Sequence, residues 1–290
     1  MHRRDFLATS ATAAAAASLP LATGAAAMPA MQDASAPAAR KGNIRHSVSK
    51  WCFGMPLEEF CVECKAMGIE AIDLLDEKDW GVPLKHGMVC SLGNGPTSIG
   101  DGMNRLENHD RVVEACERLL PIAAANKVPS VMLFSGNRRG MSDEQGLENC
   151  TVGLKRVMPI AEKHGVTILM ELLNSKVDHR DYMCDRSPWG VELVNRVGSE
   201  RFRLLYDIYH MQIMEGDVIR TIRDHHQAFG HYHTAGNPGR NEIDDTQELF
   251  YPAICRAIVA TGFKGYLAQE FIPRRNPMES LRQSIDICDV

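Results

Sequence analysis

The sequence lacks two features that would place the protein in a membrane or on nucleic acid. No apolar run reaches the roughly 20 residues that a membrane-spanning helix needs. Positive charge is scarce relative to negative charge: the formal net charge is −5, which gives no electrostatic basis for non-specific binding to nucleic acid. What remains is an ordinary globular composition, 44% hydrophobic and 24% charged over 290 residues, enough for one large core or two small ones. We therefore expect no nucleic-acid partner.

Two common cofactor signatures are also incomplete. Cys61 and Cys64 form a C-x-x-C pair, but no second pair completes a zinc site, and the surrounding "PLEEFCVECKAMG" predicts a helix. The glycines of "GNGPTSIGDG" do not match the dinucleotide pattern G-x-G-x-x-G, and Pro96 interrupts them. Neither a structural zinc site nor a dinucleotide site is predicted.

The N-terminal segment has the character of an export signal. Arg3-Arg4, followed by Asp5, Phe6 and Leu7, resembles the twin-arginine signal, and an Ala-rich middle leads to small residues near position 27. We expect residues 1–27 to be a signal peptide for the twin-arginine export machinery and residues 28–43 a flexible leader. The protein is then periplasmic or exported, with residues 44–290 as its catalytic domain. A disordered Ala-rich tail is the alternative.

The nine cysteines bear on that expectation, because exported proteins usually meet oxidising conditions. Their number is odd, and the twin-arginine route carries proteins that have already folded in the cytoplasm. Both points favour buried structural thiols over a disulfide framework.

From residue 44 onward, short apolar β-branched runs alternate with amphipathic stretches. This pattern predicts α/β architecture with a parallel sheet and right-handed crossovers. Eight candidate strands in about 250 residues fit a closed (β/α)8 TIM barrel, with an open doubly wound sheet as the alternative. The strands are expected at residues 44–49, 69–75, 87–92, 130–135, 166–172, 202–208, 228–234 and 265–271.

Four successive late strands each end in a side chain that can bind a metal. The residues are Glu171, Asp207, His233 and Glu270, spaced by 36, 26 and 37 residues. In a barrel, the C-terminal strand ends meet at one mouth, where three unpaired carboxylates would repel one another. One divalent cation resolves that conflict, and an oxygen-rich set with one nitrogen suits Mn²⁺, Mg²⁺ or Co²⁺, with Zn²⁺ also compatible. Taken singly, each residue could instead be a helix cap or an ion-pair partner.

Four stretches make a specific resemblance. "MELLNSKVDHRDY", "LLYDIYHMQI", "GHYHTAGNPGRNEI" and "GYLAQEF" resemble the hydroxypyruvate isomerase family, which belongs to the xylose isomerase-like barrels alongside the ketose 3-epimerases. The resemblance covers residues 44–290. It implies that the four residues above hold one metal, that Glu171 and Glu270 are also the acid/base pair, and that His210 and Arg240 contact substrate oxygens. One departure is His233, where hydroxypyruvate isomerases often carry Gln; the His is closer to the epimerase pattern.

These residue types suit a specific chemistry. Moving a carbonyl along a small hydroxy-keto acid or sugar requires removal of a proton beside the carbonyl through an enediolate, with a Lewis acid to stabilise charge. Arg240 can bind a carboxylate bidentately, and His179, in the loop after the fifth strand, is a further candidate for lining the substrate site. The alternatives are that His210 caps its own strand end and that Arg240 forms a surface ion pair with Glu242 or Asp244.

Other functions remain open on sequence alone. The same metal and bases would serve an epimerase or a lyase acting on a keto-sugar or glycoside, which export favours because hydroxypyruvate is a cytoplasmic metabolite. A non-catalytic sugar-binding protein and a metal-dependent DNA-repair nuclease of the same fold are further alternatives, and the acidic charge fits the nuclease poorly. The sequence also leaves open whether the chain forms a homo-oligomer.

Overall fold

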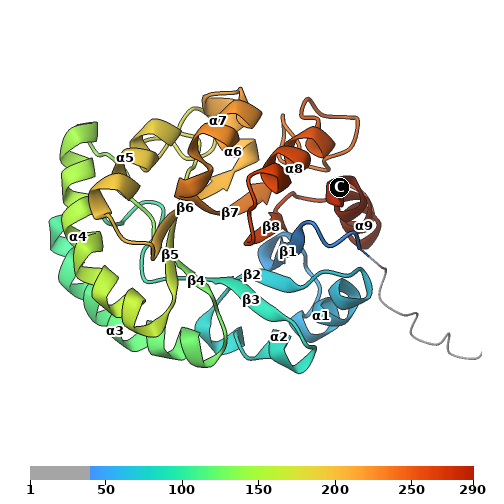
Figure 1. Ribbon diagram of the computed structural model, residues 1–290, viewed down its shortest axis with the longest axis horizontal. Coiled ribbons are helices and arrows are strands. Elements are labelled where there is room, and N and C mark those ends of the chain that lie inside the picture. The colour runs from blue at the N-terminus through green and yellow to red at the C-terminus, as the bar shows by residue number, and fades with distance from the viewer. Residues whose placement is uncertain (1–39) are drawn as a thin grey trace, which may run out of the picture. The chain divides into compact units, whose positions relative to one another are not determined.

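A computed structural model describes residues 40–290. The sequence-predicted signal peptide, residues 1–27, and residues 28–39 of the predicted leader lie outside this range. In the described range, eight parallel strands form a closed barrel in chain order (Figure 1). The strands are β1 (Arg45–Ser49), β2 (Ala71–Leu75), β3 (Val89–Gly93), β4 (Ser130–Met132), β5 (Thr167–Glu171), β6 (Phe202–Asp207), β7 (Phe229–Thr234) and β8 (Tyr266–Gln269).

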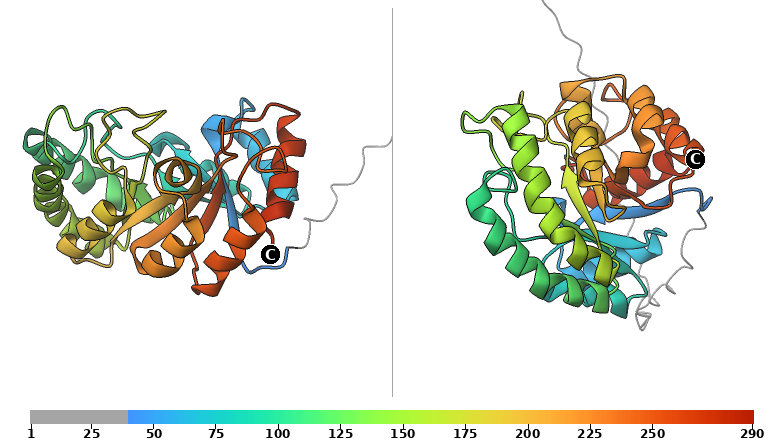
Figure 2. Two further views of the ribbon diagram at one scale, coloured as in Figure 1. Left: turned by 90° about the horizontal axis from the view of Figure 1, so that it is seen from above. Right: turned by 60° about the vertical axis from the view of Figure 1, so that its left-hand side comes forward.

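Helices connect the strands and lie on the outside of the barrel, as both views of Figure 2 show. The predicted (β/α)8 TIM barrel is confirmed, and the open doubly wound sheet is excluded because β1 pairs with β8. The helices are α1 (Leu57–Ala66), α2 (Val82–Lys85), α3 (His109–Ala125), α4 (Asp143–His164), α5 (Ser187–Val197), α6 (Ile208–Met214), α7 (Val218–His225), α8 (Tyr251–Ala260) and α9 (Pro277–Cys288).

The strands are buried on both faces, as parallel strands in barrels are. Their outward side chains form one large core with the helices. Their inward side chains fill the barrel interior, where Leu92, Met132, Leu169 and Leu205 make a separate apolar cluster. Because side chains alternate along a strand, Leu169 and Glu171 point to the same side of β5, as do Leu205 and Asp207 of β6. The apolar interior layer thus lies beneath two of the predicted metal ligands.

The structure differs from the sequence expectation after β6. The sequence predicts a strand through residue 208, whereas α6 begins at Ile208. Asp207 is the N-cap: its Oδ1 accepts a hydrogen bond from the His210 backbone N–H at 3.0 Å. His210 therefore lies on a helix, and the interpretation of His210 as a cap of its own strand end is wrong.

The N-terminal edge of the described range is anchored to the fold. The Arg40 side chain donates to the Met67 carbonyl at 2.8 Å, and Asn43 donates to the Val290 carbonyl at 2.8 Å. The described fold therefore includes four residues, 40–43, of the expected leader.

The cysteine expectation is confirmed. All nine cysteines fall within residues 40–290, where they are free thiols, and eight of them are buried. Within this same range, no helix is both long and apolar enough to cross a membrane.

Candidate active site

The four predicted metal ligands come together at the C-terminal mouth of the barrel. Glu171 and Asp207 end β5 and β6, His233 lies near the end of β7, and Glu270 follows β8. One ligand atom from each lies within 4.8 Å of the others. All four residues are at most 5% exposed. This group, hereafter the mouth cluster, is the arrangement that the spacing of the late strands predicts.

The mouth cluster contains side-chain atoms that the protein leaves unpaired. Within residues 40–290, Oε1 of Glu171 and Oδ2 of Asp207 are buried and have no hydrogen-bond partner. Such atoms are costly unless a partner satisfies them. Burial raises the pKa of Asp207 to about 7, with Glu270 and Glu171 adding to the rise and Arg240 opposing it. Buried anionic oxygens that face one another are a donor set for a hard divalent cation, so the residues fit the predicted metal.

The remaining contacts of the mouth cluster balance its charge. His233 Nδ1 lies 2.8 Å from Oε2 of Glu270 and 3.6 Å from Oε1 of Glu171. Arg240 donates from Nη2 to the same Glu270 oxygen at 2.7 Å. Burial alone would raise the pKa of Glu270, but His233 and Arg240 outweigh it and hold that pKa well below its usual range. Glu270 is therefore ionised.

Arg240 is a residue of the mouth and not of a surface ion pair. Its Nη2 lies 3.7 Å from Oδ2 of Asp207, in addition to its bond to Glu270. Its guanidinium also lies near the rings of Trp51 and Tyr209, 5.4 and 5.5 Å from their centroids. The alternative partners suggested by the sequence contact a different residue: the carboxylates of Glu242 and Asp244 lie 3.6 and 2.6 Å from nitrogens of Arg275.

His210 is held in one tautomer. Oδ1 of Asn174 accepts the backbone N–H groups of Val177 and Asp178 at 3.0 and 2.9 Å, which orients the amide. The Asn174 amide nitrogen therefore donates to His210 Nδ1 at 2.6 Å, and the ring proton must lie on Nε2. Burial, assisted by Arg240, lowers the pKa of His210 well below its usual value. A neutral His210 thus directs an Nε2–H donor toward the mouth, 3.8 Å from Oδ2 of Asp207.

His179 lies beside His210, with ring centroids 5.3 Å apart. Its ring is partly buried, and burial lowers its pKa. The structure therefore places all seven predicted site residues, the mouth cluster with His210, Arg240 and His179, in one region.

Three residues of this region escaped the sequence interpretation. Trp51 lies two residues after β1, and its indole N–H donates to Oε1 of Glu270 at 2.7 Å. Asp73 and His231 form a second buried group with His233 beneath the mouth. Asp73 in "AIDLL" carries the same signal as Asp207, a carboxylate within an apolar strand, and His231 is two residues before His233.

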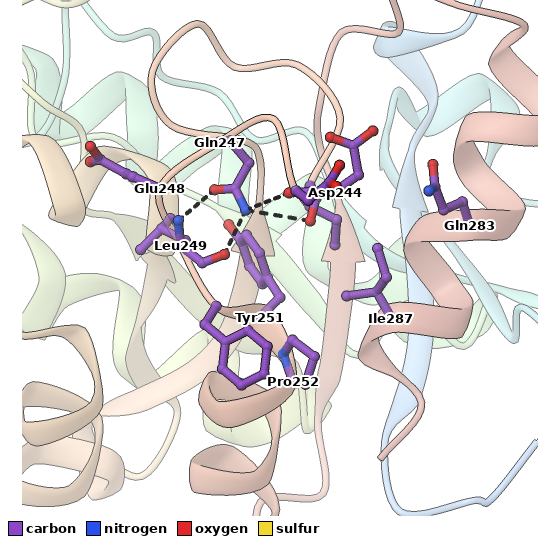
Figure 3. Close-up of a pocket in the computed structure, with 11 residues that line it drawn as sticks. Asp244, Gln247, Glu248, Leu249, Tyr251, Pro252, Gln283 and Ile287 are labelled. Atoms are coloured by element: carbon purple, nitrogen blue, oxygen red, sulfur yellow. Dashed lines mark hydrogen bonds between the residues drawn. The ribbon is translucent and has the colours of Figure 1, made fainter.

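A separate cleft lies away from these residues. It has a volume of about 470 Å³ and runs between the segment 243–252 and Gln283 and Ile287 of α9 (Figure 3). Gln247 braces the segment: its amide nitrogen donates to the carbonyls of Asp244 and Leu249, at 3.0 and 2.5 Å. No member of the mouth cluster lines this cleft.

Comparison with known proteins decides the family. The profile of the xylose isomerase-like TIM barrel family matches residues 84–289. The chain belongs to the xylose isomerase-like TIM barrel family. This confirms the family that the sequence motifs indicate.

The curated relatives share low sequence identity with this chain over only part of its length. A 2-oxo-tetronate isomerase of Cupriavidus necator is 34% identical over 39% of the chain and 43% of the relative. The hydroxypyruvate isomerase of Escherichia coli is 28% identical over 49% of the chain and 55% of the relative. The chain spans about half the length of these curated relatives. A solved structure described as an AP endonuclease of family 2 from Brucella melitensis is 25% identical, with a TM-score of 0.75, covering 82% of the chain and 97% of that protein.

Proposed function

We propose that this protein is a metal-dependent isomerase that moves a carbonyl by proton transfer on a small hydroxy-keto acid or sugar. The observation that carries the proposal is the pair of glutamates. Glu171 and Glu270 present carboxylate oxygens within 4.8 Å of one another, in one buried group with Asp207 and His233. One carboxylate can remove a proton from the carbon beside the carbonyl, and the other can deliver a proton to the former carbonyl carbon, while the proton of the neighbouring hydroxyl passes to the former carbonyl oxygen.

Each residue has a distinct role in this proposal. Trp51 and Arg240 orient the ionised Glu270, while Oε1 of Glu171 is unpaired within the described part of the chain and free to accept a proton. The Nε2–H of His210 donates to a substrate oxygen that gains negative charge. A divalent cation held by the mouth cluster would supply Lewis-acid polarisation of the carbonyl and the neighbouring hydroxyl.

The names of the relatives support this reaction class, since two of them are isomerases of short oxo or hydroxy acids. A second candidate is an epimerase or lyase acting on a keto-sugar, and His233 favours it because the resemblance places His in the epimerase pattern. Both candidates begin with proton abstraction beside a carbonyl, so one experiment tests the shared step and separates the products.

The experiment measures exchange of carbon-bound hydrogen in deuterated water. Hydroxypyruvate, 2-oxo-tetronate and keto-sugars are incubated with the protein and Mn²⁺ or Mg²⁺, and products are identified by NMR. We expect metal-dependent exchange with at least one compound, and loss of both exchange and bound metal in Asp207→Ala. Binding of sugars without any exchange would instead support a sugar-binding protein, and cleavage of abasic-site DNA would support the nuclease.

We also propose that the protein is exported through the twin-arginine pathway. The support is the Arg3-Arg4 pair and the Ala-rich segment that follows it. Replacing both arginines with lysine should retain the precursor in the cytoplasm; unchanged export would refute the proposal.

A further inference from the structure

A second polar group is buried in the barrel interior directly beneath the mouth cluster. Oδ2 of Asp73, on β2, lies 2.5 Å from His231 Nε2 and 3.2 Å from His233 Nε2, both on β7. The hydroxyl of Ser91, on β3, donates to the other Asp73 oxygen. These four residues are at most 1% exposed. Burying a carboxylate this deeply is costly, so its placement calls for a reason.

The interior residues beneath the mouth cluster are polar on β7 but apolar on β5 and β6. Two residues before Glu171 and Asp207 stand Leu169 and Leu205, which belong to the apolar interior cluster. Two residues before His233, on the same face of β7, stands His231. The apolar or polar character of each interior residue matches the mouth residue two positions later. The carboxylates of Glu171 and Asp207 turn their oxygens to the mouth and need no polar group beneath them. The imidazole of His233 has a second ring nitrogen, which faces the interior and needs a hydrogen-bond partner there.

The orientation of His233 assigns its two nitrogens. Nδ1 faces the mouth, near Glu270 and Glu171, and Nε2 faces Asp73. A carboxylate has only acceptor oxygens, so a hydrogen bond to Asp73 requires the proton on Nε2. The lone pair of a neutral ring is then on Nδ1. Metal-binding histidines are commonly oriented in this way by an outer carboxylate.

We propose that Asp73 is a positioning residue: it holds the proton of His233 on Nε2 and aims the Nδ1 lone pair at the cation of the mouth cluster. Ser91 and His231 fix the Asp73 carboxylate from the remaining directions. The inference rests on the proposed metal site. It adds to that site a residue of β2, whereas the mouth cluster comes from β5 to β8.

The same atoms do not make a second cation site. Asp73, His231 and His233 have ligand-type atoms close enough to be considered for one. However, both Asp73 oxygens have hydrogen-bond partners, Ser91 on one and the two rings at 2.5 and 3.2 Å on the other. In the mouth cluster, by contrast, Glu171 Oε1 and Asp207 Oδ2 have no partner within residues 40–290. We therefore expect one cation per chain.

The test measures the dissociation constant of Mn²⁺ by titration calorimetry for the wild-type chain, Asp73→Asn and Asp73→Ala. Asp73→Ala should weaken binding by about 10–100-fold, the usual effect of removing an outer carboxylate. Asp73→Asn should weaken it less, because an amide oxygen can still accept from Nε2. The control is Asp185→Asn, which removes a buried carboxylate bonded to Arg138 at 2.9 Å outside the cluster; its stability should fall while its Mn²⁺ affinity stays unchanged.

A second readout follows the proton itself. In the Mg²⁺-loaded, histidine-labelled protein, NMR should show a slowly exchanging Nε2–H of His233, assigned by its loss in His233→Gln, and Asp73→Asn should shift or broaden it. Mn²⁺ binding with wild-type affinity in both folded Asp73 variants would overturn the inference and leave the metal site intact. A wild-type chain that binds no cation would instead overturn the metal site itself, and two cations per chain would overturn the single-site assignment.

Discussion

At the scale of single residues, side chains of one type have been given different properties by their neighbours. Glu270 accepts from Trp51 and Arg240 and lies 2.8 Å from Nδ1 of His233, and the charges of Arg240 and His233 hold its pKa well below the usual range. Asp207 has one oxygen bonded as a helix cap and the other unpaired within residues 40–290, and burial raises its pKa. The two carboxylates therefore differ in charge and in hydrogen bonding, although both lie at the C-terminal ends of strands of the same barrel.

The first prediction concerns Glu270→Gln. The amide keeps an oxygen near the cation but cannot accept a proton usefully, so we expect hydrogen exchange to fall on the order of 10²–10⁴-fold and metal content to fall less. Exchange is measured in deuterated water alongside metal analysis of the purified protein.

The matched control is Glu215→Gln, since Glu215 accepts from the Ser187 backbone N–H at 2.8 Å outside the cluster. That variant should keep both exchange and metal. Near-normal exchange in metal-loaded Glu270→Gln would show that Glu270 transfers no proton.

At the scale of elements, short polar signals decide where the helices begin and end. Asp207 starts α6 immediately after β6, which turns the chain and brings His210 over the mouth. The longest helix among residues 40–290, α4, has both of its ends capped: Ser142 accepts from the Gln145 backbone N–H, and Gly165 adopts a left-handed conformation with φ of 68°. Caps of this kind satisfy the backbone groups that a helix leaves unpaired.

The second prediction concerns the N-cap of α4. Ser142→Ala removes an acceptor for an otherwise unpaired N–H and should lower the free energy of unfolding by about 1 kcal/mol. Ser142→Asp keeps an acceptor and should remain near wild-type stability. Urea unfolding of the three proteins gives the comparison, and equal losses for Ala and Asp would contradict a capping role.

At the scale of the whole molecule, the barrel closes where the chain's first strand meets its last, and this seam contains a buried histidine. His46 of β1 is 1% exposed, and its Nε2 lies 3.9 Å from Asp289 near the C-terminus. Burial lowers its pKa to about 4; Asp289 and Glu70 oppose that change and Arg40 adds to it. Between about pH 4 and 6.5, His46 is therefore neutral in the folded protein and protonated in the unfolded chain.

The third prediction is that His46 contributes a loss of stability in mild acid, against the opposite contribution of the raised Asp207 pKa in the same pH window. Between pH 6.5 and about 4, His46 binds a proton in the unfolded chain but not in the folded protein. The contribution of His46 to the free energy of unfolding is therefore fully present above pH 6.5 and is lost as the pH falls toward 4. A shift of this size corresponds to about 3 kcal/mol. His46→Gln should flatten the dependence of unfolding free energy on pH in this window relative to wild type. Replacement of the less buried His225 by Gln serves as the control and should leave the slope in place; an unchanged slope in His46→Gln would contradict the assignment.

The sequence by itself determined the architecture and the four residues of the mouth cluster. Alternation of apolar runs with amphipathic stretches reflects the burial of parallel strands on both faces, which is a local property of each segment. Glu171, Asp207, His233 and Glu270 could be found because each stands at the end of its own strand, and the ends of parallel strands meet at one edge. No knowledge of distant contacts was needed for either conclusion.

Only the tertiary structure decided how those residues are held. Asp73 and His231 are 158 positions apart and belong to strands that do not pair, so their contact exists only because the barrel closes. The bond of Arg240 to Glu270 and the tautomer of His210 likewise depend on groups from other βα units. Proton position and charge balance are set by atoms within about 3 Å of one another, and sequence spacing cannot resolve distances of that size.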